Sequence, residues 1–307
     1  MNYTLHQLQI FLKVAETKSI TKASEALNLT QPAVSIQMKN LQNQFDIPLT
    51  EVVGRQLYIT DFGLEIVETA QKIINEVQAI NYKTMLFKGI LSGKLTISVV
   101  STGKYVMPYF LSDFLKLNTG IDLNMDVTNK SKVIKSLENN EVDFALVSVL
   151  PKDVNLNSEI LLENKLYLIG NNEVVIPDKP FNKSIFSEIP LIYREEGSAT
   201  RLVMEQFFER NEIKAPMKLQ LTSNEAVKQA VISGLGYSIM PLIGSRNELQ
   251  SKELQIIPVS GFPIKSDWRL VWLKNKALSP VAQAYLNFLK KEKAQIVANH
   301  FSWIHTL

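Results

Sequence analysis

Cysteine is missing from this chain of 307 residues, and long apolar runs are missing too. The lack of cysteine excludes disulfide scaffolds and thiolate metal sites, and it suits a reducing compartment. No run of about 18 apolar residues occurs, so we expect no membrane-spanning helix. The first residues, MNYTLHQLQIFLKVAE, have no basic stretch ahead of an apolar core and do not resemble a signal peptide. We therefore expect a cytoplasmic protein without a membrane partner.

An excess of positive charge is also lacking where nucleic-acid binding would need it. The whole chain has a formal net charge of +3. Residues 1–92 contain eight Lys or Arg and eight Asp or Glu, so this part of the chain is neutral. A DNA-binding hypothesis must therefore depend on where a few basic residues lie.

Groups of residues typical of catalysis or of metal binding are absent as well. The segment GILSGKL resembles a P-loop, but it has three residues between its glycines, and Leu95 stands where Ser or Thr would bind magnesium. No G-x-S-x-G motif occurs. We interpret the adjacent Glu195 and Glu196 as a solvated turn rather than a catalytic pair. The three histidines lack metal-ligand spacing: His6, His300 and His305. We predict no enzymatic activity, no metal and no cofactor.

Short helical patterns fill the first 60 residues, and a small hairpin ends them. Apolar residues recur at spacings of three and four in the first helix: Leu5, Leu8, Leu12 and Ala15. The segment SITKASEALN predicts a second helix, with Thr21 as its N-cap. Thr30 is expected to cap a third helix, whose first turn tolerates Pro32 because the missing N–H is not needed there.

The third helix has a buried stripe and an unusual outer face. The stripe contains apolar residues within a narrow arc: Val34, Met38, Leu41 and Phe45. The outer face offers Ser35 for a base or a phosphate, Ile36 or Ala33 for a thymine methyl group, and Lys39 for a phosphate. Both DNA readout and an ordinary solvated helix in a small bundle fit this pattern.

Residues 60–91 predict one long helix of about 45 Å. Its apolar positions are spaced every 3.5 residues on average, as in a coiled coil: Ile66, Ala70, Ile73, Val77, Ile80, Thr84 and Phe87. Such a helix has no evident core of its own to cover, so we expect self-association. The alternative is that it packs onto its own domain.

After Gly93, predicted strands alternate with predicted helices. The first series places strands at 94–100, 121–127 and 143–149, and helices at 108–118 and 131–140. The second series places strands at 189–193, 217–221 and 236–240, and helices at 200–211 and 224–233. A strand at 268–273 and a helix at 279–292 follow, and we assign no function to the tail 293–307. The pattern predicts parallel sheets in two α/β lobes, with a ligand cleft between the lobes.

The N-terminal segment resembles the winged helix-turn-helix of LysR-type transcriptional regulators. The strongest similarity lies in SITKASEALNLTQPAVS, followed by PL, GR and T..G, and the order and length of the later elements also agree over the whole chain. The resemblance implies a winged helix-turn-helix domain at 1–60, a linker and dimerisation helix at 61–92, and an effector domain at 93–307. This effector domain would be Rossmann-like and similar to periplasmic binding proteins, with lobe I at about 93–165 and 268–292 and lobe II at about 166–267.

The resemblance also implies partners. A member of this family is a homodimer or homotetramer that binds double-stranded promoter DNA and acts with RNA polymerase. A small-molecule inducer binds between the lobes, and its binding alters DNA bending and transcription.

The resemblance implies eight DNA contacts, assigned by their position in the helix-turn-helix and its hairpin: Thr30, Gln31, Pro32, Ala33, Ser35, Ile36, Lys39 and Arg55. The sequence departs from the family pattern in three places. Ile36 replaces a frequent cation, Asp46 replaces a usual Gly, and LTEV replaces LFxR at the hairpin. We expect a left-handed backbone at Asp46, which Asp tolerates. The lower positive charge predicts weak non-specific DNA binding with a shallow salt dependence.

Hydroxyl groups and glycines where strands give way to helices are the candidate inducer contacts: Ser101, Thr102, Gly103, Thr128, Ser148, Gly197, Ser198, Ala199 and Thr200. Free N–H groups at helix starts favour a carboxylate or phosphate, so we expect an anionic metabolite. Lys104 and Arg201 are the expected assisting cations. The alternative for each hydroxyl is plain helix capping. The loop GSATR also resembles that of regulators of carbon assimilation, which does not identify a ligand.

Two other classes of function remain to be weighed. A solute-binding protein would use the same two lobes, but the missing signal peptide and the first 90 residues argue against it. An α/β enzyme is opposed by the lack of a nucleophile, base or metal constellation.

Overall fold

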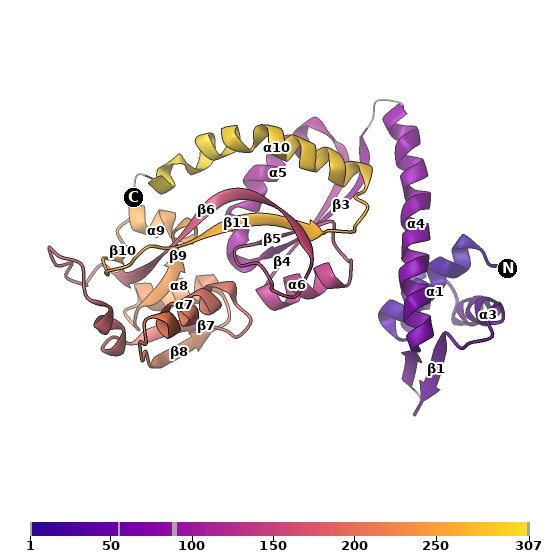
Figure 1. Cartoon of the computed structure of the whole chain (residues 1–307), viewed down its shortest axis with the longest axis horizontal. Helices are drawn as coiled ribbons and strands as arrows, with labels where there is room; N and C mark the ends of the chain where they lie inside the picture. The colour runs from indigo at the N-terminus through magenta and orange to yellow at the C-terminus, as the bar shows by residue number, and fades with distance from the viewer. Residues whose placement is uncertain (1, 55, 88–90, 306–307) are drawn as a thin grey trace. The chain divides into compact units, whose positions relative to one another are not determined.

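The computed structural model describes residues 2–54, 56–87 and 91–305. The chain divides into two compact units, Met1–Gly89 and Ile90–Leu307, and each unit is described by itself (Figure 1).

Three short helices open the first unit, each with a hydroxyl side chain at its N-cap. Thr4, Ser19 and Thr30 accept hydrogen bonds from the backbone N–H three residues later. The expected cap at Thr30 is confirmed, whereas the expectation for Thr21 is wrong, because the helix already begins at Ile20. The helices are α1 (Leu5–Thr17), α2 (Ile20–Leu27) and α3 (Gln31–Gln42). The turn from α2 to α3 passes through Asn28 in the left-handed region, with φ 54°.

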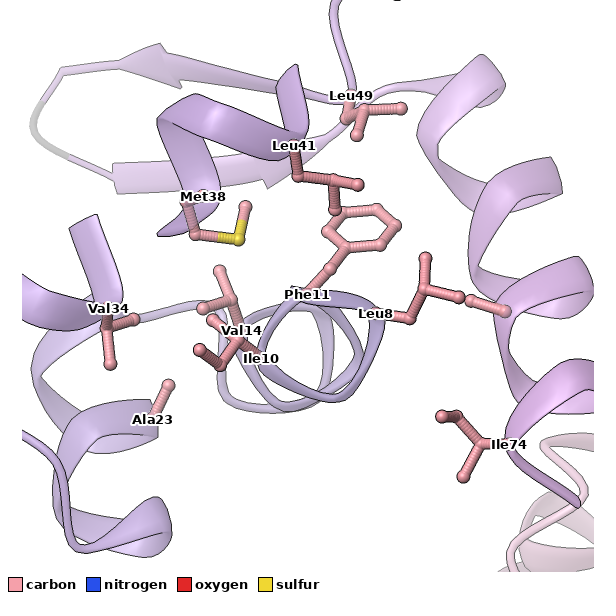
Figure 2. Close-up of a cluster of buried hydrophobic side chains, with 11 residues drawn as sticks. Leu8, Ile10, Phe11, Val14, Ala23, Val34, Met38, Leu41, Leu49 and Ile74 are labelled. Atoms are coloured by element: carbon pink, nitrogen blue, oxygen red, sulfur yellow. The ribbon is translucent and has the colours of Figure 1, made fainter. Parts of the chain in front are cut away.

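The core of the first unit forms around α1. Figure 2 shows Phe11 and Val14 of α1 among side chains from α2 and α3, with Leu8 toward the long helix. The stripe predicted on α3 is buried at Val34, Met38 and Leu41. Phe45 is half-buried and stacks on Tyr3 at 5.9 Å between ring centroids. The strands β1 (Thr50–Val53) and β2 (Gln56–Ile59) form an antiparallel hairpin beside this core.

The long helix α4 (Asp61–Phe87) begins at a closely packed corner. Thr60 Oγ1 donates to Pro48 O at 2.6 Å and accepts from Gly63 N at 2.9 Å, so it caps the helix and ties it to the preceding loop. A Cβ on Gly63 would lie 2.1 Å from Leu49 O. The T..G pattern therefore marks a helix start that packs directly against the backbone before the hairpin.

The predicted apolar seam of α4 is divided between two environments. Ile66, Ala70 and Ile73 pack into the core of the first unit. Ile74, the next residue of the helix, lies beside the same core (Figure 2). Ile80 is 62% exposed. One face of the first half of the helix thus covers its own domain, the alternative that the sequence left open, while Leu64 and Ile80 remain exposed.

One mixed sheet runs through the second unit, in the order β10-β6-β11-β5-β3-β4, with β9 also pairing with β6. Its strands are β3 (Ser92–Val100), β4 (Gly120–Thr128), β5 (Phe144–Val147), β6 (Leu156–Asn171), β9 (Ser238–Pro241), β10 (Leu254–Ile257) and β11 (Ile264–Leu273). The strands β7 (Leu191–Arg194) and β8 (Met217–Leu221) form a parallel pair. An isolated parallel β-bridge joins Leu191 of β7 to Tyr237, the residue before β9, and so connects this pair to β9.

The expectation of parallel sheets holds only in part. Pairs β3–β4, β3–β5 and β7–β8 are parallel, but β6 pairs antiparallel with β11, β9 and β10. The sequence analysis missed β6 and β10. The strand β6 carries Glu159, Glu163 and Asn164 inside its run, so its apolar pattern is interrupted and its register depends on β11, far along the chain.

We define lobe I by β3, β4, β5, α5 (Met107–Leu117), α6 (Lys130–Glu138) and α10 (Pro280–Phe301). Lobe II contains β7 to β10, α7 (Ala199–Arg210), α8 (Asn224–Ile232) and α9 (Arg246–Gln250). The short 3-10 helices are η1 (Ser101–Tyr105), η2 (Lys183–Ser187), η3 (Leu242–Gly244) and η4 (Ser302–His305). The strands β6 and β11 both continue across the expected lobe boundaries, with a register shift in their pairing between Trp268 and Arg269.

The helix α10 is longer than expected and gives the tail a structural role. It continues to Phe301, which is 1% exposed and stacks on Phe110 of α5 at 5.7 Å between ring centroids. Trp303 of η4 then lies over Arg246 of α9, with 4.8 Å from guanidinium carbon to ring centroid. The end of the chain therefore contacts lobe I through Phe301 and lobe II through Trp303, above the long strands (Figure 1).

Among the described residues, no helix combines the length and the apolar character needed to cross a bilayer. The same residues contain no cluster of three or more His, Asp or Glu arranged to hold a metal ion.

Candidate functional site

The helix α3 presents most of the predicted DNA contacts to solvent. Thr30, Gln31, Pro32, Ile36 and Lys39 are exposed, with Ile36 57% exposed. The remaining two positions of the helix, Ala33 and Ser35, are half-buried. The hydroxyl of Thr30 also accepts from the N–H of Ala33 at 3.4 Å, so capping and a DNA contact share the same side chain.

The hairpin beside α3 is apolar rather than basic in its described part. Val52 and Val53 are 69% and 60% exposed, and Glu51 is exposed next to them. Arg55, the predicted wing contact, lies outside the described residues. Asp46 does not adopt the left-handed backbone expected for it, because its φ is not positive. The turn after α3 is therefore compatible with an ordinary residue at this position.

A small pocket in the second unit brings together residues from both lobes. Five predicted residues line it: Ser101, Thr102, Ser198, Ala199 and Thr200. Four residues that the sequence analysis missed also line it: Val100, Asn129, Lys130 and Arg194. The cavity measures about 10 Å³, which is room for one water at most, so a larger ligand requires side chains or lobes to move apart.

Three largely buried residues in this pocket have hydroxyl groups without a hydrogen-bond partner among the described residues. Thr102, Ser198 and Thr200 are 4%, 5% and 7% exposed. Within the described part of the chain, their hydroxyl groups make no hydrogen bond, and Ser198 precedes α7 without capping it. None of the three hydroxyl oxygens is among the fully buried side-chain atoms that lack a partner, so each keeps some contact with the cavity or with solvent. The pocket therefore offers unused hydrogen-bonding capacity.

Two cations reach the pocket from opposite lobes. Lys130 begins α6 in lobe I, and burial lowers its pKa. No ion pair forms at Lys130 among the residues that the structure describes. Arg194 ends β7 in lobe II, is 3% exposed, and donates from Nη2 to Ser101 Oγ at 3.3 Å. Both cations, together with the free N–H groups at the start of α7, favour an anion.

The other predicted effector residues lie outside the pocket lining. Thr128 supports it through its carbonyl oxygen, which accepts from Ser101 Oγ at 3.1 Å. Gly103 is buried, and a Cβ there would meet Val99 Cγ1 at 2.6 Å. Ser148 is half-buried at the end of β5 and does not reach the lining. Gly197 lies beside the pocket at φ +81°.

The two predicted assisting cations form ion pairs outside the pocket. Lys104 pairs with Glu225 of α8 at 3.6 Å. Arg201 pairs with Glu205 at 2.6 Å and donates to Gln220 Oε1 at 2.7 Å. Neither side chain lines the pocket.

The interpretation of Glu195 and Glu196 as a solvated turn is right for one residue only. Glu196 is 87% exposed at its side chain, 3.7 Å from Arg201. For Glu195 the interpretation is wrong, because its side chain is only 16% exposed and its carboxylate accepts two hydrogen bonds from Arg194. The sequence does not distinguish the two, because their environments depend on how the loop turns away from β7.

A second inter-lobe contact involves Tyr105 of η1, whose hydroxyl donates to Glu225 of α8. Burial and the neighbouring carboxylate raise the pKa of Tyr105 far above its usual value. Burial alone would raise the pKa of Glu225, but the bonds from Tyr105 and Lys228 lower it. Lys228 pairs with Glu225 at 2.9 Å and with Glu248 at 2.7 Å, so its pKa is raised despite its burial.

A signal for the missed residues was present in the sequence. Arg194 comes directly after the apolar run IPLIY, and Asn129 and Lys130 come directly after the strand ending at Thr128. In open α/β sheets, ligands bind at the carboxyl ends of the strands. Applying that rule to charged and amide side chains as well as to hydroxyls would have found all three.

Comparison with known proteins covers both units. Residues 5–64 match the family model described as bacterial regulatory helix-turn-helix protein, lysR family. Residues 88–294 match the model described as LysR substrate binding domain. The HTH-type transcriptional activator CmpR of Synechocystis sp. is 35% identical over 289 residues, covering 94% of this chain and 95% of that protein. The RuBisCO operon transcriptional regulator of Allochromatium vinosum is 35% identical over 297 residues, covering 96% of this chain and 98% of that protein.

Among solved structures, the regulatory domain of Synechocystis CcmR, in complex with 2-PG, is similar to the second unit. It is 32% identical, with a TM-score of 0.63, and covers 66% of this chain and 98% of that domain.

Proposed function

We propose, since this chain belongs to the LysR family of DNA-binding transcriptional regulators, that its second unit binds a small anionic effector in the pocket between η1 and the start of α7. The observation that carries this proposal is that Thr102, Ser198 and Thr200 line the pocket and are largely buried, while their hydroxyl groups make no hydrogen bond among the described residues. Ser101 and the first-turn N–H groups of α7 complete the expected contacts.

A phosphorylated carboxylate is the class of effector that the pocket fits best. Its charges would meet Lys130 from lobe I and Arg194 from lobe II, and its oxygen atoms would accept from the hydroxyls and from the α7 N–H groups. The CcmR regulatory domain, which is similar to this unit, is known in complex with 2-PG. We therefore propose 2-phosphoglycolate, or an anion of the same chemistry, as the effector.

Isothermal titration of the full-length protein with 2-phosphoglycolate tests this site. Thr200→Val keeps the shape of the side chain but removes the hydroxyl, and it should weaken binding about tenfold, the equivalent of about 1.4 kcal/mol. Ser148→Ala is the matched control, since Ser148 was predicted from sequence but lies outside the lining. Equal binding by wild type and Thr200→Val, or a loss in Ser148→Ala only, would contradict the proposed site.

We also propose that the effector acts on promoter binding through the first unit. The exposed face of α3, from Gln31 to Lys39, would enter the major groove, and the hairpin with Arg55 would reach the backbone or the minor groove. Domain limits near 60 and 92, with effector lobes as defined above, are part of this proposal. A gel shift with the gene's own upstream DNA, with and without 2-phosphoglycolate, tests the coupling; unchanged binding and an unchanged footprint would contradict it.

Self-association through α4 is a further part of the proposal, as a homodimer or homotetramer in the cytoplasm. Leu64 and Ile80 of α4 are exposed apolar residues, 53% and 62% exposed. Sedimentation of the wild type and of a double Leu64→Glu and Ile80→Glu variant measures this assembly. RNA polymerase is the remaining proposed partner, without an assigned surface.

A further inference from the structure

Arg194 is already neutralised inside the effector pocket. Its Nε donates to Glu195 Oε2 at 2.8 Å, and its Nη2 donates to Glu195 Oε1 at 3.0 Å. A carboxylate on the Nε and Nη2 edge of a guanidinium has the same two-pronged geometry that arginine uses for a bound carboxylate or phosphate. Glu195 therefore occupies the edge that a ligand anion would take.

Little else holds the Glu195 carboxylate in this position. Arg194 is its only hydrogen-bond or ion-pair partner among the residues that the structure describes. The side chain is 16% exposed, and the next residues, Glu196 and Gly197, lie at the surface, so a rotated Glu195 carboxylate can reach water. Arg194 by contrast is 3% exposed and carries a charge that must be matched wherever it is buried.

We propose that Glu195 is an internal competitor for the effector: it holds Arg194 in the ligand-free protein and is displaced when the ligand anion binds. This inference rests on the proposed effector site. The replacement of Glu195 by the ligand anion on Arg194 determines which anions bind tightly. A singly charged carboxylate replaces Glu195 with an equivalent group and gains little. A phosphate dianion brings more charge and more acceptor oxygens to Arg194 and Lys130, so it displaces Glu195 more effectively.

Glu195→Gln tests the competition in the full-length protein, with Glu196→Gln as the matched control. The probes are 2-phosphoglycolate and glycolate, which lacks the phosphate, and the measurement is isothermal titration. We expect Glu195→Gln to bind 2-phosphoglycolate about tenfold more tightly and to gain more for glycolate, so that the preference for the phosphorylated probe narrows. Glu196→Gln should stay within about twofold of wild type.

A second variant separates displacement from a general effect of negative charge. Glu195→Asp keeps the charge, but its shorter side chain cannot reach both guanidinium nitrogens, so it should also bind 2-phosphoglycolate more tightly than wild type. If Glu195→Gln does not fold, Glu195→Asp still tests the competition.

Three outcomes decide the matter. Tighter binding by Glu195→Gln and Glu195→Asp supports the competition. Wild-type binding with equal or weaker binding by these variants overturns it, since Glu195 would then only orient Arg194. Absence of binding in wild type and in both variants overturns the effector site itself, and the competition with it.

Discussion

Gly197 of lobe II faces Ser131 of lobe I so closely that a Cβ at Gly197 would lie 2.6 Å from Ser131 Oγ. Gly197 also has φ +81°, a conformation that side chains disfavour. The sequence predicted Gly197 as a ligand contact, whereas the structure places it where the two lobes meet beside the pocket. Its lack of a side chain thus determines how closely the lobes approach.

Replacing Gly197 with Ala is expected to weaken binding of 2-phosphoglycolate about tenfold, because the methyl group clashes with Ser131 Oγ and displaces the loop that leads into Ser198. Titration calorimetry measures this. Gly234→Ala is the control, since Gly234 has nearly the same φ, +79°, but its added Cβ would meet only Asn171 Nδ2 at 3.4 Å. Equal losses in both variants would attribute the effect to backbone strain and contradict the contact.

Replacing Glu225 with Gln is expected to lower the melting temperature by about 2 °C at pH 7, since a half-exposed ion pair contributes little. The folded-state pKa of Glu225 is lowered, so its contribution is present above the unfolded-state value and is lost as the pH falls through the folded one. The difference from wild type should therefore shrink as the pH falls below the unfolded-state pKa and vanish once it is below the lowered folded-state pKa.

Thermal unfolding of the Glu225 variant between pH 3 and pH 8 provides the measurement. The control is Asp113→Asn, which removes an exposed pair with Lys116 inside a single helix. A difference from wild type that grows on acidification would refute the assignment.

Replacing Phe301 with Ala should reduce the free energy of unfolding by about 3–5 kcal/mol, because it empties a space packed between Tyr109 and Phe110. Denaturant unfolding of the full-length protein gives the value. His300→Ala, at the neighbouring exposed position, should cost far less. A loss below about 1 kcal/mol in Phe301→Ala would show that the end of α10 does not stabilise lobe I.

Replacing Ile36 with Ala should reduce the preference for the gene's own upstream DNA over a scrambled sequence by about fivefold, since an exposed apolar contact to a thymine methyl group is lost. Lys39→Ala should instead weaken binding to both DNAs equally and reduce the salt slope by about 1. Fluorescence anisotropy at several salt concentrations distinguishes the two. An unchanged preference in Ile36→Ala would remove this residue from the base-reading surface.

Local signals in the sequence were enough for α3, although they misplaced the start of α2 at Thr21. Thr30 and Pro32 mark the start of α3, and Val34, Met38 and Leu41 mark its buried side, all within about three turns. The long-range parts were not accessible in the same way. The strand β6 depends on β11 for its register, and the partner of Glu195 depends on how the loop after β7 folds back. A residue whose role is set by the fold of its loop, such as Glu195, has the sequence pattern of an ordinary surface charge.

The strand β6 enters lobe I at Leu156 and leaves lobe II at Asn171 as one continuous element. It pairs with β11 on the side of lobe I and with β9 and β10 in lobe II. A sharp bend in it would break backbone hydrogen bonds, whereas a sheet accommodates changes in twist. A change in the angle between the lobes would therefore twist the long strands over many residues rather than bend them at one. The two long strands thus join the lobes mechanically, so that a displacement at the rim of the pocket would be shared between lobe I and lobe II.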